Sequence, residues 1–372
     1  MRPEKKIDWP PIVFFSDGFD WPLKGNRYWF PYYWSRIAPV LVVTPPVSWR
    51  AAVSQILVGR DSLEEISPNL SVFRPAKFNF GLEEVIRKFS CSKPIFWHFY
   101  PEIFSRAVRS PHCFDVYHLV DLIWQYPFYY PAPDDRRKAK QLNYKVIRQA
   151  DLVLTSSLYL KKICRKLNSR TFLVGNGSRT ELIADLIGKV RLRPRDLTGI
   201  KPPVVGLVGN MTGFRFDFSL VEFLARKMPQ LNFVLIGPTD RKLRLNELAV
   251  KLDNFHWLGP KPFEALPAYF KSFNLGLVPY KRNEHTRGIL PIKLFEFLAA
   301  GLPVVAADLY SLRAYRKWVY LAADRREFVE QISRALAEER GELKNQRKEF
   351  ALDHSWEKIV EKSAVMVKSF LP

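Results

Sequence analysis

The chain has 372 residues, of which 47% are hydrophobic, and it carries a formal net charge of +21 at pH 7. This length and composition predict a globular protein with enough apolar side chains to form the cores of two domains. No apolar run approaches the roughly 20 residues of a membrane-spanning helix. The excess of positive charge favours a polyanion or an anionic membrane surface as partner and says nothing about the fold.

The first residues are basic and are followed by only a short apolar stretch, residues 12–15. A signal peptide needs a longer apolar segment, so we expect the protein to stay in the cytoplasm. The chain contains three cysteines without metal-ligand spacing: Cys91, Cys113 and Cys164. This odd number favours free thiols that pack in a reducing compartment.

The first half of the chain alternates apolar runs with amphipathic segments. Runs that end at turn-forming residues predict strands at residues 12–15, 40–43, 94–98, 116–119, 150–155 and 172–174. A helix is expected between the fourth and fifth of these strands, and another after the serine pair that follows the fifth. Strands that alternate with helices indicate an α/β fold with a parallel, doubly wound sheet.

Two aromatic segments lie in this half. Residues 26–34 are mostly aromatic, and such a stripe is more often core than ligand platform, but the embedded Pro31 argues against a fully buried regular element. Residues 122–131 contain Pro127 and Pro131, which exclude a regular helix. We therefore expect the aromatic rings of the second segment on a loop.

Cations cluster on the two predicted helices. The first carries Arg136, Arg137, Lys138, Lys140, Lys145 and Arg148, and the second carries Lys161, Lys162, Arg165 and Lys166. A single run of charge is usually a solvated face, but two consecutive runs favour a basic surface. Because an aromatic loop, residues 124–130, lies beside them in sequence, we expect this half to dock on an anionic membrane.

The second half repeats the strand and helix pattern after residues 189–203, which carry three prolines and several cations and predict a linker. Strands are expected at residues 203–208, 233–236, 256–258 and 275–279 and after Pro303, and helices at 218–227, 327–340 and 355–370. We predict an N-terminal domain of residues 1–190, a linker at 191–203, a second domain at 204–352 and a final helical segment at 353–372. A cleft between two such domains would bind a ligand at the carboxyl ends of the strands.

Residues 287–308 predict a loop, a short helix and a buried strand. Pro291 suits the first helical position, and Gly301 suits the left-handed position after the last. Lys293 opposes the helix dipole at a cost of roughly 0.3 to 1 kcal/mol unless an anion binds there. A phosphate would resolve this conflict, and Glu296 could then accept hydrogen bonds from a ribose. The alternative is an exposed pair of Lys293 and Glu296 on a solvated face, and spacing alone does not decide between the two.

Four runs of the second half resemble the donor domain of GT-B glycosyltransferases, as found in bacterial enzymes of cell-surface polysaccharide synthesis of the teichuronic-acid and xanthan-glucuronosyltransferase types. The runs are PVVGLVGNMTGFRFDF, NFVLIGP, NFHWLGPKPFEALPAYFKSFNLGLVPY and LPIKLFEFLAAGLPVVAAD, and the closing run HSWEKIVEK resembles a helix that crosses back to the first domain. The resemblance implies two Rossmann-like domains that face each other across a cleft, with residues 353–372 packed on the N-terminal domain.

Carried over position by position, the resemblance implies a nucleotide-sugar donor site made of Gly209, Asn210, Met211, Gly237, Gly259, Tyr280, Lys293 and Glu296. The turn after the first strand would face the phosphates, Lys293 would hold the pyrophosphate, and Glu296 would hold the ribose. Tyr280 and the main chain of the later glycines would frame the base. The resemblance implies a nucleotide diphosphate sugar, with UDP or GDP, as co-substrate, and we expect no metal and no other cofactor.

The run DVYHLVDLIWQYP resembles the segment that carries an acidic catalytic residue in inverting relatives. Asp121 follows the predicted strand at 116–119, so it is expected at the carboxyl end of that strand as the base that takes the acceptor's proton. A turn cap is the alternative for a loop aspartate. Two positions depart from the family: Gly288 replaces the first of the two glutamates of many retaining enzymes, and Leu122 stands where relatives often have a second acid.

These features favour an inverting enzyme that transfers a sugar to a lipid-linked or membrane-proximal glycan at the inner face of the cell membrane. One alternative is a basic nucleic-acid-binding module, which the charge and the aromatic residues would suit. Another is a GT-B sugar-nucleotide epimerase, which needs acidic residues on both sides of the cleft. None of the short nucleic-acid-binding signatures is present in the sequence, so we do not expect nucleic acid as a partner.

Overall fold

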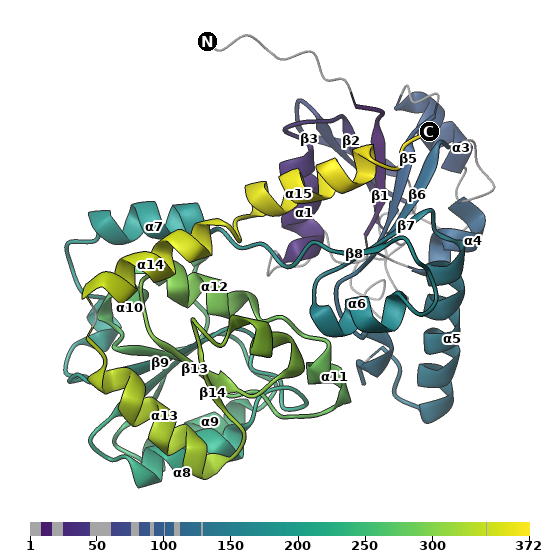
Figure 1. The fold of residues 1–372 in the computed structure, drawn as a ribbon. Helices are drawn as coiled ribbons and strands as arrows, with labels where there is room; N and C mark the ends of the chain where they lie inside the picture. Colours follow the sequence, from purple (N-terminus) through teal and green to yellow (C-terminus); the bar gives the residue numbers. More distant parts are fainter. Residues whose placement is uncertain are drawn as a thin grey trace. The chain divides into compact units, whose positions relative to one another are not determined.

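The computed structural model describes residues 9–16, 25–44, 61–75, 82–89, 93–99, 101–107, 112–127, 129–339 and 341–372. The chain forms two compact units (Figure 1): unit 1 consists of Met1–Gly175 and Ile359–Pro372, and unit 2 consists of Asn176–Lys358. Residues 17–20, which follow the first predicted strand, and Cys91 lie outside the described residues. No helix among the described ranges is long and apolar enough to span a bilayer.

In its described part, unit 1 contains an eight-stranded sheet with the order β3-β4-β2-β1-β5-β6-β7-β8. Neighbouring strands are parallel except β3 and β4, which form an antiparallel pair at one edge. The strands are β1 (Ile12–Phe15), β2 (Val40–Val43), β3 (Ser62–Ser67), β4 (Leu70–Arg74), β5 (Ile95–His98), β6 (Phe114–Leu119), β7 (Leu152–Thr155) and β8 (Thr171–Leu173). The six strands predicted for this half are confirmed, and β3 and β4 were not predicted.

The helices described in unit 1 are α1 (Asn26–Trp34), α3 (Leu82–Lys88), α4 (Phe104–Ala107), α5 (Pro133–Gln149) and α6 (Leu158–Cys164), with short 3₁₀ turns η1 (Pro101–Ile103) and η2 (Ile123–Gln125). The last helix, α15 (Trp356–Lys368), starts in unit 2 and belongs to unit 1 from Ile359 onward. Cys113 and Cys164 are free thiols, and Cys164 is buried.

The aromatic segment at residues 26–34 forms α1 despite its proline. Phe30 and Trp34 are fully buried, so the core interpretation is confirmed. The segment is a regular helix, but Trp29, Tyr32 and Tyr33 are only partly buried, so it is not the fully buried regular element that Pro31 argued against. Pro31 has no N–H to donate to the carbonyl of Arg27, one helical turn earlier. The Ser16 hydroxyl donates to that carbonyl at 3.2 Å instead. This contact satisfies the acceptor that the proline leaves, so the helix can continue.

Unit 2 contains a six-stranded parallel sheet with the order β11-β10-β9-β12-β13-β14. The strands are β9 (Val204–Val208), β10 (Asn232–Ile236), β11 (Phe255–Trp257), β12 (Leu275–Val278), β13 (Val304–Ala307) and β14 (Tyr320–Ala322). The chain moves outward from β9 to β11 and then returns to add β12 on the other side of β9. The strand order therefore reverses between β9 and β12, the place where open α/β sheets form a ligand crevice.

Helices cover both faces of this sheet (Figure 1). α7, α10, α12 and α14 contact one another on one face, while α8, α9 and α13 cover the other. Their bounds are α7 (Thr180–Lys189), α8 (Phe218–Lys227), α9 (Lys242–Lys251), α10 (Leu266–Ser272), α11 (Glu284–Arg287), α12 (Ile292–Ala299), α13 (Arg325–Ala337) and α14 (Gly341–Leu352), with 3₁₀ turns η3 (Arg195–Leu197), η4 (Phe263–Ala265) and η5 (Tyr310–Tyr315). The helix predicted at 218–227 is confirmed.

Glycines in the strands allow the helices to pack closely on the sheet. A Cβ at Gly276 in β12 would lie 2.5 Å from the Phe297 ring of α12, and one at Gly206 in β9 would lie 2.0 Å from the Phe273 ring. Both phenylalanines are buried in the core of unit 2. The Phe297 ring occupies the space that a side chain at position 276 would fill. α12 therefore packs directly on β12, the strand beside the reversal point.

The chain enters unit 2 earlier than the linker predicted at residues 191–203. The crossing falls between Gly175 and Asn176. α7 packs on α10, α12 and α14, and its Ile183 is fully buried in the core of unit 2. The predicted linker also lies inside unit 2, where Leu197 is buried in the same core. Its prolines shape a surface connection within the unit and do not separate two domains.

Candidate functional site

A pocket lies at the carboxyl ends of β9 and β12 and at the first turn of α12. Its cavity volume is about 10 Å³, within about 260 Å³ of empty space that includes open solvent. Its lining is Val208, Gly209, Asn210, Met211, Phe216, Leu277, Val278, Pro279, Tyr280 and Lys293. Five of the predicted donor residues, Gly209, Asn210, Met211, Tyr280 and Lys293, therefore lie around one pocket at the reversal of strand order.

The two remaining glycines belong to the loops that support this pocket. The amide of Gly209 donates to the carbonyl of Ile236 at 3.0 Å, and the amide of Gly237 donates to the carbonyl of Gly259 at 2.9 Å. The Trp257 indole donates to the Gly237 carbonyl at 3.1 Å. The loops after β9, β10 and β11 are thus joined in series by main-chain hydrogen bonds.

Gly237 permits the closest approach between these loops. Its φ is +141°, and a Cβ built there would lie 1.9 Å from the carbonyl oxygen of Gly209. Any larger residue would have to push the β10 loop away from the turn that lines the pocket.

Gly237→Ala is expected to lower the free energy of unfolding by about 1 to 3 kcal/mol, the usual cost of a strained backbone. Gly188→Ala is the matched control, because Gly188 lies in α7 with open space around its Cβ position. That control should be neutral or stabilising by up to about 1 kcal/mol. Urea denaturation of both variants measures the difference, and equal stability losses would contradict the close-approach argument.

Lys293 and Glu296 form an ion pair on the first turns of α12. The ammonium Nζ lies 2.5 Å from Oε2 of Glu296, whose residue is only 3% exposed. The Lys293 stem passes over Gly209, where Cε and Cγ would lie 3.7 Å from a built Cβ. The alternative predicted that Lys293 and Glu296 pair on a solvated face. The pairing is present, but the prediction of a solvated face is wrong, since the carboxylate is buried. A lysine has three donors, so Lys293 can pair with Glu296 and also donate to an anion in the pocket.

The N-terminus of α12 differs by one residue from the prediction. Pro291 occupies the cap position with extended geometry, and the helix begins at Ile292. At the other end Gly301 has φ +76°, as predicted for the residue beyond the helix. The free amides of the first turn point along the helix axis, so this end adds positive potential beside Lys293.

Arg215 does not line the pocket but contacts two residues that do, and the sequence interpretation missed it. Its Nη2 donates to the carbonyl of Asn210 at 3.1 Å, and its Cζ lies 5.6 Å from the centre of the Tyr280 ring. The amide of Lys281 donates to the Arg215 carbonyl at 2.8 Å. Arg215 therefore joins the loop after β9 to the loop after β12. It is the one cation in the run GNMTGFRFDF, a signal that could have singled it out.

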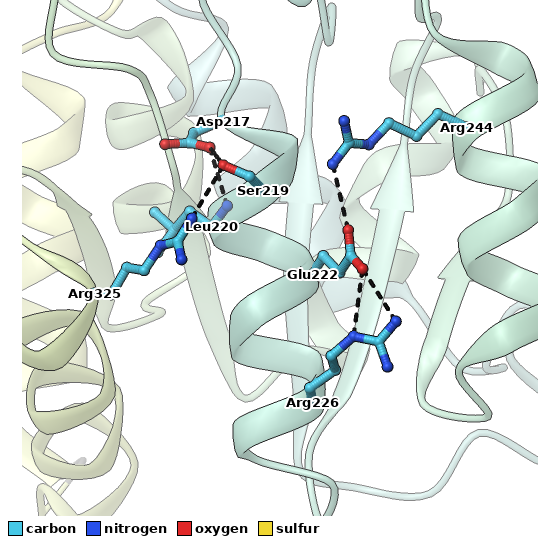
Figure 2. Close-up of polar contacts among 7 residues, drawn as sticks. All are labelled: Asp217, Ser219, Leu220, Glu222, Arg226, Arg244 and Arg325. Carbon is cyan, nitrogen blue, oxygen red and sulfur yellow. Dashed lines mark hydrogen bonds and ion pairs between the residues drawn. The ribbon is translucent and has the colours of Figure 1, made fainter.

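A second hollow lies between α8 and α9 and is lined mostly by charged side chains. Glu222 accepts hydrogen bonds from Arg226 at 3.1 Å and from Arg244 at 3.3 Å (Figure 2). These contacts are exposed pairs of the kind that contribute little energy. The hollow shares no lining residue with the pocket, and we assign no function to it.

Asp121 belongs to unit 1, two residues beyond the end of β6. It is partly buried, and its Oδ2 accepts a hydrogen bond from the Tyr126 hydroxyl at 3.0 Å. Its carbonyl accepts from the amide of Ile123 at 2.9 Å, which starts the 3₁₀ turn η2. The predicted position at the carboxyl end of a parallel strand is therefore correct. Tyr126 orients the carboxylate.

The aromatic loop at residues 124–130 faces the interior of unit 1 more than predicted. Trp124 is 2% exposed, and the Tyr130 hydroxyl donates to Glu102 at 2.7 Å. Tyr129 is 43% exposed, and Phe128 lies outside the described residues. Apolar contacts with α5 explain the burial of Trp124. The prediction that the aromatic rings of this whole loop anchor the protein in a membrane is therefore wrong, since Trp124 is buried.

The basic face predicted for the first of the two helices is present on α5. Its buried residues, Ala139, Asn143, Val146 and Ile147, form one side, and Arg137, Lys138, Lys140, Lys145 and Arg148 are exposed on the other. Lys162, Arg165 and Lys166 are exposed at and after the end of α6. These eight residues are called the basic face below.

Asp115 lies in β6 and is not part of the candidate site. It accepts hydrogen bonds from His98 at 2.8 Å and from His112 at 2.6 Å. Burial acts to raise the pKa of Asp115, but these two hydrogen bonds outweigh it and lower the pKa. Burial lowers the pKa of His118 to about 3, with help from the charge of Arg27, so this imidazole is neutral.

The two units together have the GT-B fold of glycosyltransferases. Sucrose-phosphate synthase from Thermosynechococcus elongatus matches with a TM-score of 0.68 and 16% identity, over 97% of this chain and 99% of that one. Anabaena Alr3699/HepE, solved in complex with UDP, matches with a TM-score of 0.65 and 15% identity, over 97% and 100% of the two chains. At these identities the likeness establishes the fold alone, and the GT-B prediction is confirmed.

Residues 202–338, which lie within unit 2, match the family model described as Glycosyl transferases group 1. A curated relative, named as the teichuronic acid biosynthesis glycosyltransferase TuaH of Bacillus subtilis (strain 168), is 30% identical over 232 residues. The match covers 59% of this chain and 57% of TuaH, so the chain spans little more than half the length of that relative.

Proposed function

We propose that the protein is a glycosyltransferase that moves a sugar from a nucleotide diphosphate sugar to a glycan acceptor, with inversion at the anomeric carbon. The observation that carries this proposal is the pocket of a Glycosyl transferases group 1 domain in which Lys293 and the N-terminus of α12 meet the Gly209 turn. Positive potential at this point suits a diphosphate.

The pocket supports a division of roles among its residues. Lys293 and the first amides of α12 would stabilise the diphosphate as it leaves, because they supply positive potential where negative charge develops. Glu296 would accept hydrogen bonds from the ribose, and Tyr280 would pack on the base. Arg215, which lies against Tyr280, would add a second cation to this wall. UDP is the first nucleotide to test, since HepE was solved with UDP and with UDP and glucose.

In the proposed reaction Asp121 takes the proton from the acceptor hydroxyl as its oxygen attacks the anomeric carbon. The bond between this carbon and the diphosphate oxygen breaks, and the electron pair leaves with the nucleotide diphosphate. The positive end of α12 and Lys293 supply charge stabilisation, so we propose that transfer needs no metal ion. Proton NMR of the product tests inversion, and a product that keeps the donor's anomeric configuration would contradict it.

A nucleotide panel tests this function most directly. UDP or GDP is expected to raise the melting temperature of the protein, because a ligand that binds only the folded state stabilises it, while single-stranded DNA should not. Activity should persist in EDTA. Stabilisation by DNA alone would favour the nucleic-acid-binding alternative, and activity abolished by EDTA and restored by magnesium would contradict metal independence.

We propose a lipid-linked or membrane-proximal acceptor, with the protein peripheral on the cytoplasmic side of the cell membrane. The support is the basic face of unit 1 and the name of the relative TuaH, which refers to teichuronic acid biosynthesis. Each cation near an anionic bilayer contributes roughly 1 kcal/mol.

Liposome flotation tests the membrane contact. Replacing Arg137, Lys138, Lys145 and Arg148 with glutamine is expected to weaken binding to anionic vesicles by about tenfold or more. The control variant replaces four exposed cations of unit 2 with glutamine: Lys201, Lys227, Lys251 and Arg326. Both variants lose the same net charge, so equal weakening would show that total charge, and not the basic face, determines binding.

A further inference from the structure

The segment that carries the chain into unit 2 and the segment that carries it out lie side by side. Ser178 and Ser355 form a parallel bridge. The amide of Ser178 donates to the carbonyl of His354 at 2.9 Å, and the amide of Trp356 donates to the carbonyl of Ser178 at 3.1 Å. A Cβ at Gly177 would lie 2.4 Å from the Trp356 ring, so the two segments are in close contact. Residues 176–178 and 354–356 are called the crossing pair below.

The crossing pair contacts α12 and the loop before it at three points. The Asn176 side chain donates to the carbonyl of Leu290 at 2.8 Å. The Ser178 hydroxyl donates to Oε1 of Glu296 at 3.3 Å. His354 stacks on Phe295, with ring centres 4.1 Å apart and an angle of 14° between the planes. These contacts reach both the entry of the helix and its buried carboxylate.

Glu296 is therefore held at both carboxylate oxygens. Oε1 accepts from Ser178, which is 1% exposed, and Oε2 accepts from Lys293, which lines the pocket. A buried carboxylate that loses one partner must reorient or bear an unpaired oxygen, and either change would move the ammonium bonded to the other oxygen.

We infer that Ser178 is a positioning residue of the donor site: it fixes the Glu296 carboxylate and, through it, the Lys293 ammonium. This inference rests on the proposed function, because it assigns Ser178 a role in nucleotide binding. Ser178 does not line the pocket and acts through Glu296. The crossing pair, which lies where the chain enters and leaves unit 2, thereby helps to fix the geometry of the proposed donor site.

Ser355 offers a matched control for this role. It is as buried as Ser178 and belongs to the same crossing pair, but its hydroxyl accepts from the amide of Lys358 at 3.1 Å, at the start of α15. Ser178→Ala and Ser355→Ala each remove one buried hydroxyl from the same bridge. Only the first removes a contact with Glu296.

The experiment is calorimetric titration of UDP, or of GDP if wild type binds GDP and not UDP, into five proteins: wild type, Ser178→Ala, Ser355→Ala, Glu296→Gln and the double variant Ser178→Ala with Glu296→Gln. Ser178→Ala is expected to weaken UDP affinity about threefold to tenfold, the effect of one lost hydrogen bond, while Ser355→Ala leaves it unchanged. In the Glu296→Gln background the additional effect of Ser178→Ala should disappear, because the two residues act as one unit.

The outcomes separate the inference from the proposed function. If wild type binds neither UDP nor GDP, the proposed function fails and the inference fails with it. If wild type binds UDP but Ser178→Ala binds equally well, only the inference is overturned. Equal weakening by Ser178→Ala and Ser355→Ala, or full additivity with Glu296→Gln, would also overturn it, since a purely structural role gives those results.

Discussion

Lys293→Ala is expected to weaken UDP binding by about 1.5 to 3 kcal/mol, the range for a hydrogen bond to a charged group. Lys293 lies in the first turn of α12 and is the one lysine or arginine in the pocket lining. Its removal also leaves Glu296, which is 3% exposed, with one partner fewer. The variant therefore loses a donor to the diphosphate and leaves Oε2 of the buried Glu296 carboxylate without its lysine partner, so both effects weaken the site.

Lys261→Ala is the matched control for this prediction. Lys261 forms an ion pair with Asp196 at 2.7 Å, and its side chain is 25% exposed, compared with 21% for Lys293. Both variants remove one paired lysine from unit 2, but Lys261 is not in the pocket lining. Calorimetry with UDP should show a loss for Lys293→Ala alone. Unchanged affinity in Lys293→Ala would remove this pocket as the donor site.

Asp121→Asn is expected to reduce sugar transfer at least about a hundredfold, the lower end of general-base contributions, while UDP affinity stays at the wild-type value. Asparagine keeps the size of the side chain and can still accept from Tyr126, but it cannot take a proton at neutral pH. The fold should therefore be preserved. Turnover assays combined with UDP titration separate loss of chemistry from loss of binding.

Two further variants sharpen the test of Asp121. Tyr126→Phe removes the hydroxyl that orients the carboxylate and should reduce turnover by less than Asp121→Asn does. Asp135→Asn changes an exposed aspartate in the first turn of α5 and should have no effect on transfer. Transfer by Asp121→Asn at near wild-type rate would show that Asp121 only starts the η2 turn and that another group is the base.

The regular elements follow from local patterns because their causes are local. The apolar runs before Gly or Pro predicted β9, β10 and β12, and the helix at 218–227 has the predicted bounds. Such strands are buried on both faces in a parallel sheet, so their composition alone marks them. The pair β3 and β4 was missed, because β3 is an edge strand whose exposed Ser and Glu residues give no apolar signal.

The residues of the proposed donor site were predicted from short motifs. The structure shows why some of their contacts could not be predicted. Glycines at positive φ, such as Gly209 and Gly237, belong to turns that a sequence can mark. Arg215, by contrast, lies beside the pocket only through its contacts with the lining residues Asn210 and Tyr280. Asn210 lies five residues before Arg215 and Tyr280 lies far along the chain, so no local sequence pattern predicts these contacts.

The contrast is clearest at α12. Pro291, the amphipathic run and Gly301 mark the beginning, the buried face and the end of this helix, since each acts on the backbone within one or two turns. The same residues left open whether Lys293 and Glu296 face solvent. That outcome depends on Ser178, 118 positions from Glu296, and on the chain returning beside it at residues 354–356. Burial is a property of what packs over a side chain, so only the tertiary structure decides it.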